Sequence, residues 1–235
     1  MPPTAPALHA NRLLAALPHK DRQHLLSNCE QVELVFGEVL CEPGDHIHHV
    51  YFPTDSYISL VSPIDSQACL EVALVGTEGM HDIALALGID VSPLRALVQG
   101  EGISLRMKTS YFRRELRHSP ALQRGINRYI YVRMSQLAQT AACTRFHLVE
   151  ARLARWLLMT QDRAHSNKLH ITHEFLAYML GVRRVGITKA AGSLQKRKLI
   201  NYSRGTITVL NRRGLEAASC GCYQADKATY DRTIA

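Results

Sequence analysis

Residues 171–200, ITHEFLAYMLGVRRVGITKAAGSLQKRKLI, form the stretch of sequence that decides the fold. Thr172 is a good N-cap for a first helix, and Gly181 permits the tight turn that ends it. A second helix is predicted to start at Arg183 and to continue to about Lys198. Two helices joined by a short glycine-containing turn are typical of a helix-turn-helix, whose second helix enters the major groove of DNA.

A β-hairpin is predicted directly after these helices. Leu199 to Leu210 (LINYSRGTITVL) contains two short strand-like runs around Ser203-Arg204-Gly205, and a hairpin here makes the motif winged. Apolar spacing directs one face of each helix into a core, which consists of Phe175, Leu176, Met179, Leu180, Val182, Ile187, Ala191 and Leu194.

The opposite face of the second helix carries the predicted DNA contacts. Arg184 and Lys189 are suited to guanine O6 and N7, and Val185 is suited to a thymine methyl group. Other polar residues are placed to hold the phosphate backbone, which sets register without reading sequence. These backbone candidates are Thr172, His173, Arg183, Thr188, Lys196, Ser203 and Arg204.

The charge of this region points to a polyanionic partner. Residues 175–215 contain no acid but nine basic side chains, and folded surfaces normally mix both signs. From Thr144 onward the chain has sixteen Lys and Arg against six Asp and Glu, a balance of +10. The preceding residues hold the remaining twelve basic and fourteen acidic side chains, a balance of −2. Only the C-terminal part is therefore adapted to a nucleic acid.

Upstream of the basic region the pattern changes twice. Residues 11–28 predict a short helical lead that Pro18 interrupts. Residues 30–107 predict short strands separated by Gly, Pro and Asp turns, as in a small antiparallel roll or barrel.

A long helix is expected over residues 119–143, because apolar residues recur there at three- and four-residue spacing. A second copy of the helix is the simplest cover for this stripe and predicts a homodimer. The alternative is packing against the strand domain of the same chain. The predicted interface residues are Leu122, Ile126, Tyr129, Ile130 and Leu137.

Several classes of protein are disfavoured. No apolar run approaches the roughly 20 residues of a membrane span, and the N-terminus does not resemble a signal peptide, so a cytoplasmic protein without a membrane partner is expected. The six cysteines are expected to be reduced thiols. The HIHH run, His46 to His49, suggests a metal site, but a polar turn is favoured because no catalytic motif accompanies it.

The sequence resembles the Crp/Fnr regulators in GEVLCEPGD (37–45), HVYFPTDSYISLV (49–61), VEARLARWLLM (149–159), residues 171–200 and YSRGTITVL (202–210). The resemblance implies an α+β fold in three parts. These are a cyclic-nucleotide-binding-like β-roll (residues 1–118), a dimerisation helix (119–143) and a winged helix-turn-helix domain (144–235). It also implies a homodimer that regulates transcription at pseudo-palindromic double-stranded DNA, with RNA polymerase as a partner and no enzymatic activity.

The effector region departs from the family pattern. In GTEGMHDIALALG (76–88) and beyond, Ile83 stands where cyclic AMP binders have a ribose-binding Glu, and Ser92 where they have a phosphate-binding Arg. A phosphate without a partner in an apolar pocket is costly, so cyclic AMP is not the expected effector. The candidate pocket consists of Met80, Asp82, Ile83, Ser92 and Arg95, and the effector is unknown.

No cofactor and no metal is expected. Cys29 and Cys41 are too sparse for an iron-sulfur cluster. A haem or redox role for Cys143, His147 or Cys220-Gly221-Cys222 stays open, although buried thiols are favoured. In the recognition helix, Val185 replaces the acid of the best-known family pattern. Loss of that acceptor for cytosine N4 predicts a different half-site.

A second function fits the same pattern. A ligand-sensing dimer that acts through protein association, with DNA binding secondary, uses the β-roll and long helix equally well. The basic surface argues against it, because such a module has no need of nine basic side chains without an acid.

Overall fold

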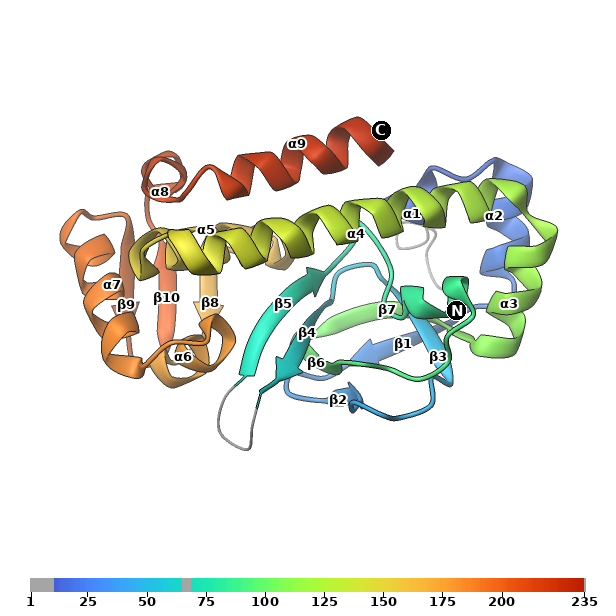
Figure 1. Cartoon of the computed structure of the whole chain (residues 1–235), viewed down its shortest axis with the longest axis horizontal. Coiled ribbons are helices and arrows are strands. Elements are labelled where there is room, and N and C mark those ends of the chain that lie inside the picture. The colour runs from blue at the N-terminus through green and yellow to red at the C-terminus, as the bar shows by residue number, and fades with distance from the viewer. Residues whose placement is uncertain (1–10, 65–68, 235) are drawn as a thin grey trace, which may run out of the picture. The chain divides into compact units, whose positions relative to one another are not determined.

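The computed structural model describes residues 11–64 and 69–234. They form an α+β fold of two compact units (Figure 1), which confirms the predicted fold class. The N-terminal unit comprises Met1–Leu60, Ala73–Met134 and Tyr230–Ala235, and the C-terminal unit comprises Val61–Val72 and Ser135–Thr229. No helix in the described ranges combines the length and hydropathy that a bilayer crossing requires.

The N-terminal unit is built on two antiparallel sheets. One has the order β1-β7-β3 and the other the order β2-β6-β4-β5. Its strands are β1 (Glu30–Leu34), β2 (Val39–Cys41), β3 (His49–Pro53), β4 (Tyr57–Pro63), β5 (Cys69–Val75), β6 (Arg95–Gly100) and β7 (Gly102–Lys108). Its first helices are α1 (Arg12–Ala15), α2 (His19–Leu26), the 3-10 helix η2 (Ile83–Leu87) and α3 (Thr109–His118).

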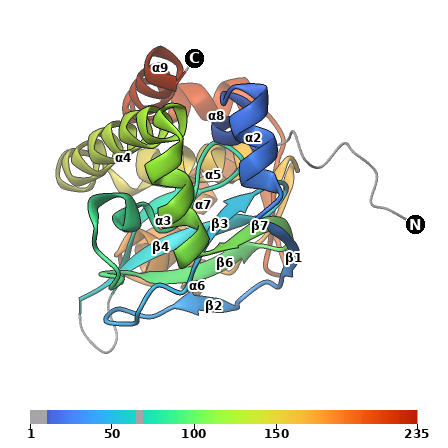
Figure 2. The ribbon, with the colours of Figure 1, turned by 90° about the vertical axis from the view of Figure 1, so that its right-hand side faces the viewer.

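Buried side chains from strands of both sheets pack against one another. Leu34 of β1 and Tyr51 of β3 share a buried cluster with Ile58 of β4 and Val98 of β6, so the sheets face one another (Figure 2). The roll predicted over residues 30–107 is therefore confirmed. Neither β6 nor α3 was among the predicted elements.

The helix α4 (Pro120–Phe146) confirms the predicted long helix. Pro120 stands at its first residue, where a missing N–H costs nothing. Leu122, Ile126 and Tyr129 are at most 1% exposed and belong to a core cluster with α1, β3 and β7, and Ile130 packs against that cluster. The prediction that Leu122, Ile126 and Tyr129 lie in a dimer interface is wrong, because residues of their own chain bury them. These three residues follow the alternative, in which the helix packs against the strand domain of the same chain.

The C-terminal unit begins in the second half of α4 and continues with helices and a small sheet of order β8-β10-β9. Its elements are α5 (Val149–Ala164), β8 (Lys168–His170), α6 (His173–Leu180), α7 (Arg184–Lys196), β9 (Ile200–Ser203), β10 (Thr206–Val209), α8 (Arg212–Ala218) and the start of α9 (Cys222–Ile234). Residues 61–64 and 69–72, which include the end of β4 and the start of β5, also belong to this unit.

Candidate DNA-binding surface

Helix α6 and its turn have the predicted geometry. The Thr172 side chain accepts a hydrogen bond from the Phe175 backbone N–H at 3.1 Å and so caps the helix. Gly181 ends the helix with a φ of +60°, and a Cβ at this position would lie 3.2 Å from the Leu70 side chain. Both the backbone conformation and the close neighbour favour glycine at the turn.

Helix α7 presents a buried face and an exposed face. Ile187, Ala191 and Leu194 are at most 1% exposed and attach the helix to the domain core. The exposed face of its first half carries the three predicted base contacts, and Val185 is 59% exposed although it is apolar. An exposed valine beside Arg184 is suited to contact with a thymine methyl group in the groove.

His173 has a structural role that the sequence did not indicate. Its ring stacks on Tyr202 of β9 with centroids 4.0 Å apart. Its Nδ1 lies 3.2 Å from Thr188 Oγ1, which donates to the Arg184 carbonyl at 3.1 Å and so accepts from the imidazole. Partial burial, followed by the positive charge of Arg184, lowers the pKa of His173 below its ordinary value. A neutral His173 thus links α6, α7 and the wing.

The wing tip is formed by two residues with positive φ. Arg204 has a φ of +48° and Gly205 a φ of +75°, as in the tight turns that match the twist of hairpin strands. Thr206 pairs with Ser203 across the turn. The strands therefore present exposed Ser203 and Arg204 at the tip.

Most cations of the acid-free stretch lack an acidic partner. Arg197 pairs with Glu150 at 2.8 Å, and Arg212 pairs with Asp162 at 2.7 Å and Glu216 at 3.1 Å. Arg212 is thus a structural residue. The other seven are exposed and form no ion pair in the described part of the chain: Arg183, Arg184, Lys189, Lys196, Lys198, Arg204 and Arg213.

All ten predicted DNA-contact residues lie on α6, α7, the turn between them or the wing, or directly flank these elements. Nine of them are exposed, and His173 is half-buried. Their contact with DNA stays a prediction.

A segment distant in sequence supports the helix-turn-helix. Buried Trp156 of α5 donates from Nε1 to Glu71 Oε1 at 2.8 Å, and the Cys69 thiol donates to the Tyr178 carbonyl of α6 at 3.3 Å. The sequence did not predict this contact, because the pairing of residues 69–71 with 156–178 has no local signal.

The predicted effector residues already contact other residues of the N-terminal unit. Met80 is 1% exposed in the core, and Ile83 packs against the same cluster. Ser92 donates to the Leu94 carbonyl at 2.9 Å, and Arg95 pairs with Glu42 at 2.9 Å. Asp82 has a φ of +68°, and its carboxylate lies 2.9 Å from the Nε2 of buried His81.

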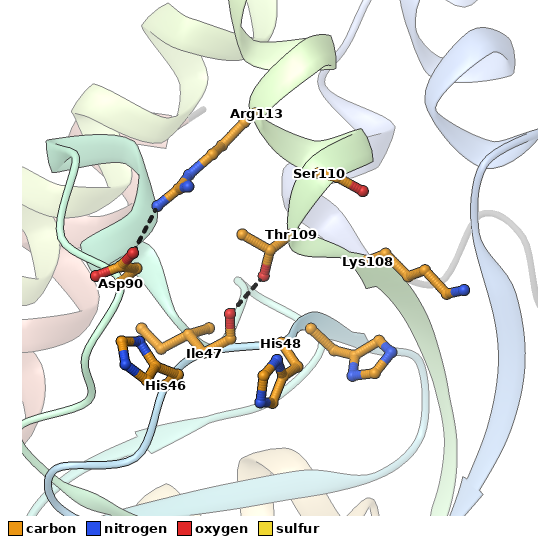
Figure 3. Close-up of a pocket in the computed structure, with 9 residues that line it drawn as sticks. His46, Ile47, His48, Asp90, Lys108, Thr109, Ser110 and Arg113 are labelled. Atoms are coloured by element: carbon orange, nitrogen blue, oxygen red, sulfur yellow. Dashed lines mark hydrogen bonds and ion pairs between the residues drawn. The ribbon is translucent and has the colours of Figure 1, made fainter.

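The HIHH run lines a surface pocket of about 630 Å³. Figure 3 shows Arg113 directed at Asp90, at 3.5 Å, and Thr109 donating to the Ile47 carbonyl at 2.7 Å. The pocket lining consists of His46, Ile47, His48, His49, Asp90, Lys108, Thr109, Ser110 and Arg113. These histidines are not in the one metal-ligating group found within residues 11–64 and 69–234.

That group consists of Cys143, His147, Cys220 and Cys222. The structure thus brings together the residues whose redox or metal role the sequence had left open. Their spacing along the chain gave no reason to connect them.

Comparison with known families identifies the C-terminal domain. Residues 151–218 match the model of the Crp-like helix-turn-helix domain. The chain carries a Crp-like helix-turn-helix. A search of curated protein sequences finds no match.

The Crp/Fnr resemblance extends over the rest of the chain as a similarity of fold. A crp/fnr-family transcriptional regulator from Eubacterium rectale superposes with a TM-score of 0.69 at 18% identity, covering 88% of this chain and 96% of that one. The c-di-GMP-responsive global regulator CLP of Xanthomonas campestris gives 0.67 at 15% identity, covering 82% and 99%. FixK2 from Bradyrhizobium japonicum gives 0.67 at 12% identity, covering 82% and 98%.

The predicted Crp/Fnr resemblance is therefore confirmed, by family in the Crp-like helix-turn-helix and by fold over most of the chain. The matched domain supports a coarse function in DNA-binding transcription regulation.

Proposed function

We propose that this Crp-type regulator is a homodimer that binds a pseudo-palindromic operator and reads its sequence with the start of α7. The observation that carries the proposal is the exposed first half of α7. Arg184, Val185 and Lys189 lie there without an acidic partner in the described structure, beside a wing that is also basic. Cations without partners on a folded surface are adapted to an external polyanion.

Within this function the residues divide into two roles. Arg184 and Lys189 donate to guanine, and Val185 contacts a thymine methyl group. The remaining set fixes the domain on the phosphates. It consists of Thr172, Arg183, Lys196, Ser203 and Arg204, because His173 and Thr188 already use their donor hydrogens within the domain.

The outer face of α4 supports a dimer. Tyr131 and Met134 are 56% and 63% exposed, and exposed Ala138 and Ala141 follow at intervals of four and three residues. This spacing is the heptad pattern of a two-helix seam. Leu137, 42% exposed, flanks it and remains a proposed interface residue. Two recognition helices then meet half-sites about 34 Å apart.

Cyclic AMP is not proposed as the effector. Ser92 offers no positive charge at the position where cyclic AMP binders have arginine, and nearby Arg95 pairs with Glu42 at 2.9 Å. A cyclic phosphate in this region would lack a free cation, which makes its burial costly. The proposed compartment is the cytoplasm, where the chain meets its DNA and RNA polymerase.

Selection of bound duplexes from a random pool, followed by anisotropy titration, tests this function. The expected result is a pseudo-palindromic consensus, bound by two chains about 10³-fold or more tighter than a scrambled duplex. Affinity should fall steeply with salt, with a slope of about −0.9 per phosphate contact. Equal affinity for every duplex, or binding by one chain only, would contradict the proposal.

A further inference from the structure

Three cysteines and a histidine meet at the two ends of the Crp-like helix-turn-helix domain. Cys143 lies in the last turn of α4, and His147 follows the helix end. Cys220 and Cys222 lie at the junction of α8 and α9. All four fall just outside residues 151–218, two before the matched domain and two after it. A bond between one of the first two residues and one of the last two therefore joins the two flanks of the domain.

Their ligand atoms lie close to the spacing that a tetrahedral metal requires. The Sγ atoms of Cys143 and Cys220 are 3.5 Å apart, and Cys222 Sγ lies 3.5 Å from His147 Nδ1. All four ligand atoms lie within 4.8 Å of one another. A tetrahedral zinc ion with Zn–S of about 2.3 Å and Zn–N of about 2.0 Å needs S···S separations of about 3.8 Å and S···N separations of about 3.5 Å.

Local structure explains why the ligands converge. The His147 backbone N–H donates to the Cys143 carbonyl at 3.1 Å, so these residues are one helical turn apart on the same face. Cys220 and Cys222 flank a single glycine where the chain turns into α9. The three cysteines are buried against Ala151, whereas His147 is exposed and leaves a path for an ion to enter.

Two neighbours of the cluster can stabilise cysteine thiolates once a metal is bound. Gln139 Nε2 donates to Cys222 Sγ at 2.9 Å. Arg155 is 7% exposed, pairs with Asp226 at 2.6 Å and interacts electrostatically with the Cys143 sulfur. Its buried Nε has no hydrogen-bond partner among the described residues. Three thiolates around a divalent ion carry a net charge of −1, which this guanidinium, shared with Asp226, offsets only in part.

We propose that Cys143, His147, Cys220 and Cys222 bind one zinc ion in a closed Cys3His site. Each cysteine releases its proton to solvent on binding, and the neutral imidazole donates from Nδ1. Four protein ligands leave no open coordination position, so the ion is structural. It fastens the end of α4 to the α8–α9 junction. This inference is independent of the proposed DNA contacts.

The test is metal analysis of the full chain, purified in reductant without chelator. The expected content is one zinc ion per chain, and cobalt(II) added to metal-free protein should give tetrahedral d–d bands with sulfur charge transfer. Cys222→Ser and the exposed His147→Ala should lose the ion to a competing chelator. Gln139→Leu should weaken binding about 10- to 100-fold. Cys29→Ser, in the N-terminal unit, is the matched control and should retain the metal.

Circular dichroism of each variant separates loss of metal from loss of fold. Folded, reduced wild-type protein that takes up no zinc would overturn the proposal. The same holds if folded Cys222→Ser and His147→Ala both keep zinc as tightly as the wild type. A Cys143–Cys220 disulfide in freshly prepared protein, found by peptide mapping without bound metal, would replace the metal site with a redox pair.

Discussion

At the scale of single residues, the basic surface is not uniform. Arg184 lies on the exposed start of α7, Arg204 at the wing tip, and Arg213 on α8 outside the predicted contacts. Arg197 forms an ion pair with Glu150, and Arg212 forms one with Asp162. A count of charges in the acid-free stretch therefore overstates the number of side chains that are free to meet DNA.

Arg204→Asn should weaken binding to all duplexes alike, because a phosphate contact carries no sequence information. Asparagine tolerates the φ of +48° at this position, so the turn should persist. The slope of log affinity against log salt should become shallower by about one unit for each phosphate that the arginine no longer neutralises. Arg213→Ala is the matched control and should leave the slope unchanged. A change confined to the selected operator would indicate base contact instead.

His173 should make the stability of the domain depend on pH. The pKa of His173 is lowered in the folded state, so its contribution is present above the unfolded value of about 6.5 and is lost as pH falls through the folded pKa. His173→Phe keeps an aromatic ring against Tyr202 but does not titrate. Thermal unfolding is measured between pH 8 and about pH 5. The melting temperature of the wild type should fall further over this range than that of the variant. Parallel curves would show that His173 is not coupled to folding.

At the scale of elements, the turn between α6 and α7 depends on Gly181 and on residues 69–71, which lie against it. Gly181 adopts a left-handed conformation with the Leu70 side chain close by. Gly192 lies within α7, and a Cβ there would meet no atom within 4 Å. The same substitution should therefore have opposite effects at the two positions.

Gly181→Ala should lower the free energy of unfolding by about 1–2 kcal/mol, because alanine is strained in the left-handed region. Gly192→Ala should raise it by about 0.5–1 kcal/mol, the usual gain inside a helix. Chemical denaturation of both variants beside the wild type measures the difference. Destabilisation by Gly192→Ala equal to that by Gly181→Ala would contradict the structure of the turn.

Elements that depend on local chemistry were predictable. Thr172, Gly181 and the apolar spacing of α7 each have a sequence signal, so the helix-turn-helix and the exposure of its contact residues followed from them. The docking of Glu71 on Trp156 and the meeting of Cys143 with Cys220 did not, because such contacts join segments far apart in the chain. Periodicity also could not tell which face of α4 the chain itself covers.

At the scale of the whole molecule, α4 has two apolar faces that differ in exposure. Leu122 is 1% exposed in the core of its own chain, whereas Tyr131 and Met134 are more than half exposed. The inner face belongs to the monomer. We assign the outer face to a second copy of the chain.

Substitutions on the two faces should separate folding from assembly. Leu122→Ala should cost about 2–5 kcal/mol of stability, as large-to-small changes in a core do. Met134→Glu should leave the monomer folded, because the side chain is exposed. In a dimer the substitution would place two negative charges in the seam between the helices, so sedimentation should detect monomers. Gln123→Glu, exposed near the start of the helix, is the charge control. A dimer that withstands Met134→Glu and Tyr131→Glu would place the interface elsewhere.

The most direct test of the central claim is the specificity ratio of Arg184→Ala. It compares affinity for the selected operator with affinity for a scrambled duplex at one salt concentration. We expect the ratio to fall about 5- to 150-fold for each half-site, the value of one bidentate guanine contact of about 1–3 kcal/mol, so that the losses at the two half-sites multiply, while non-specific affinity changes far less. An unchanged ratio in a folded variant would contradict the assignment of α7 as the helix that reads DNA sequence.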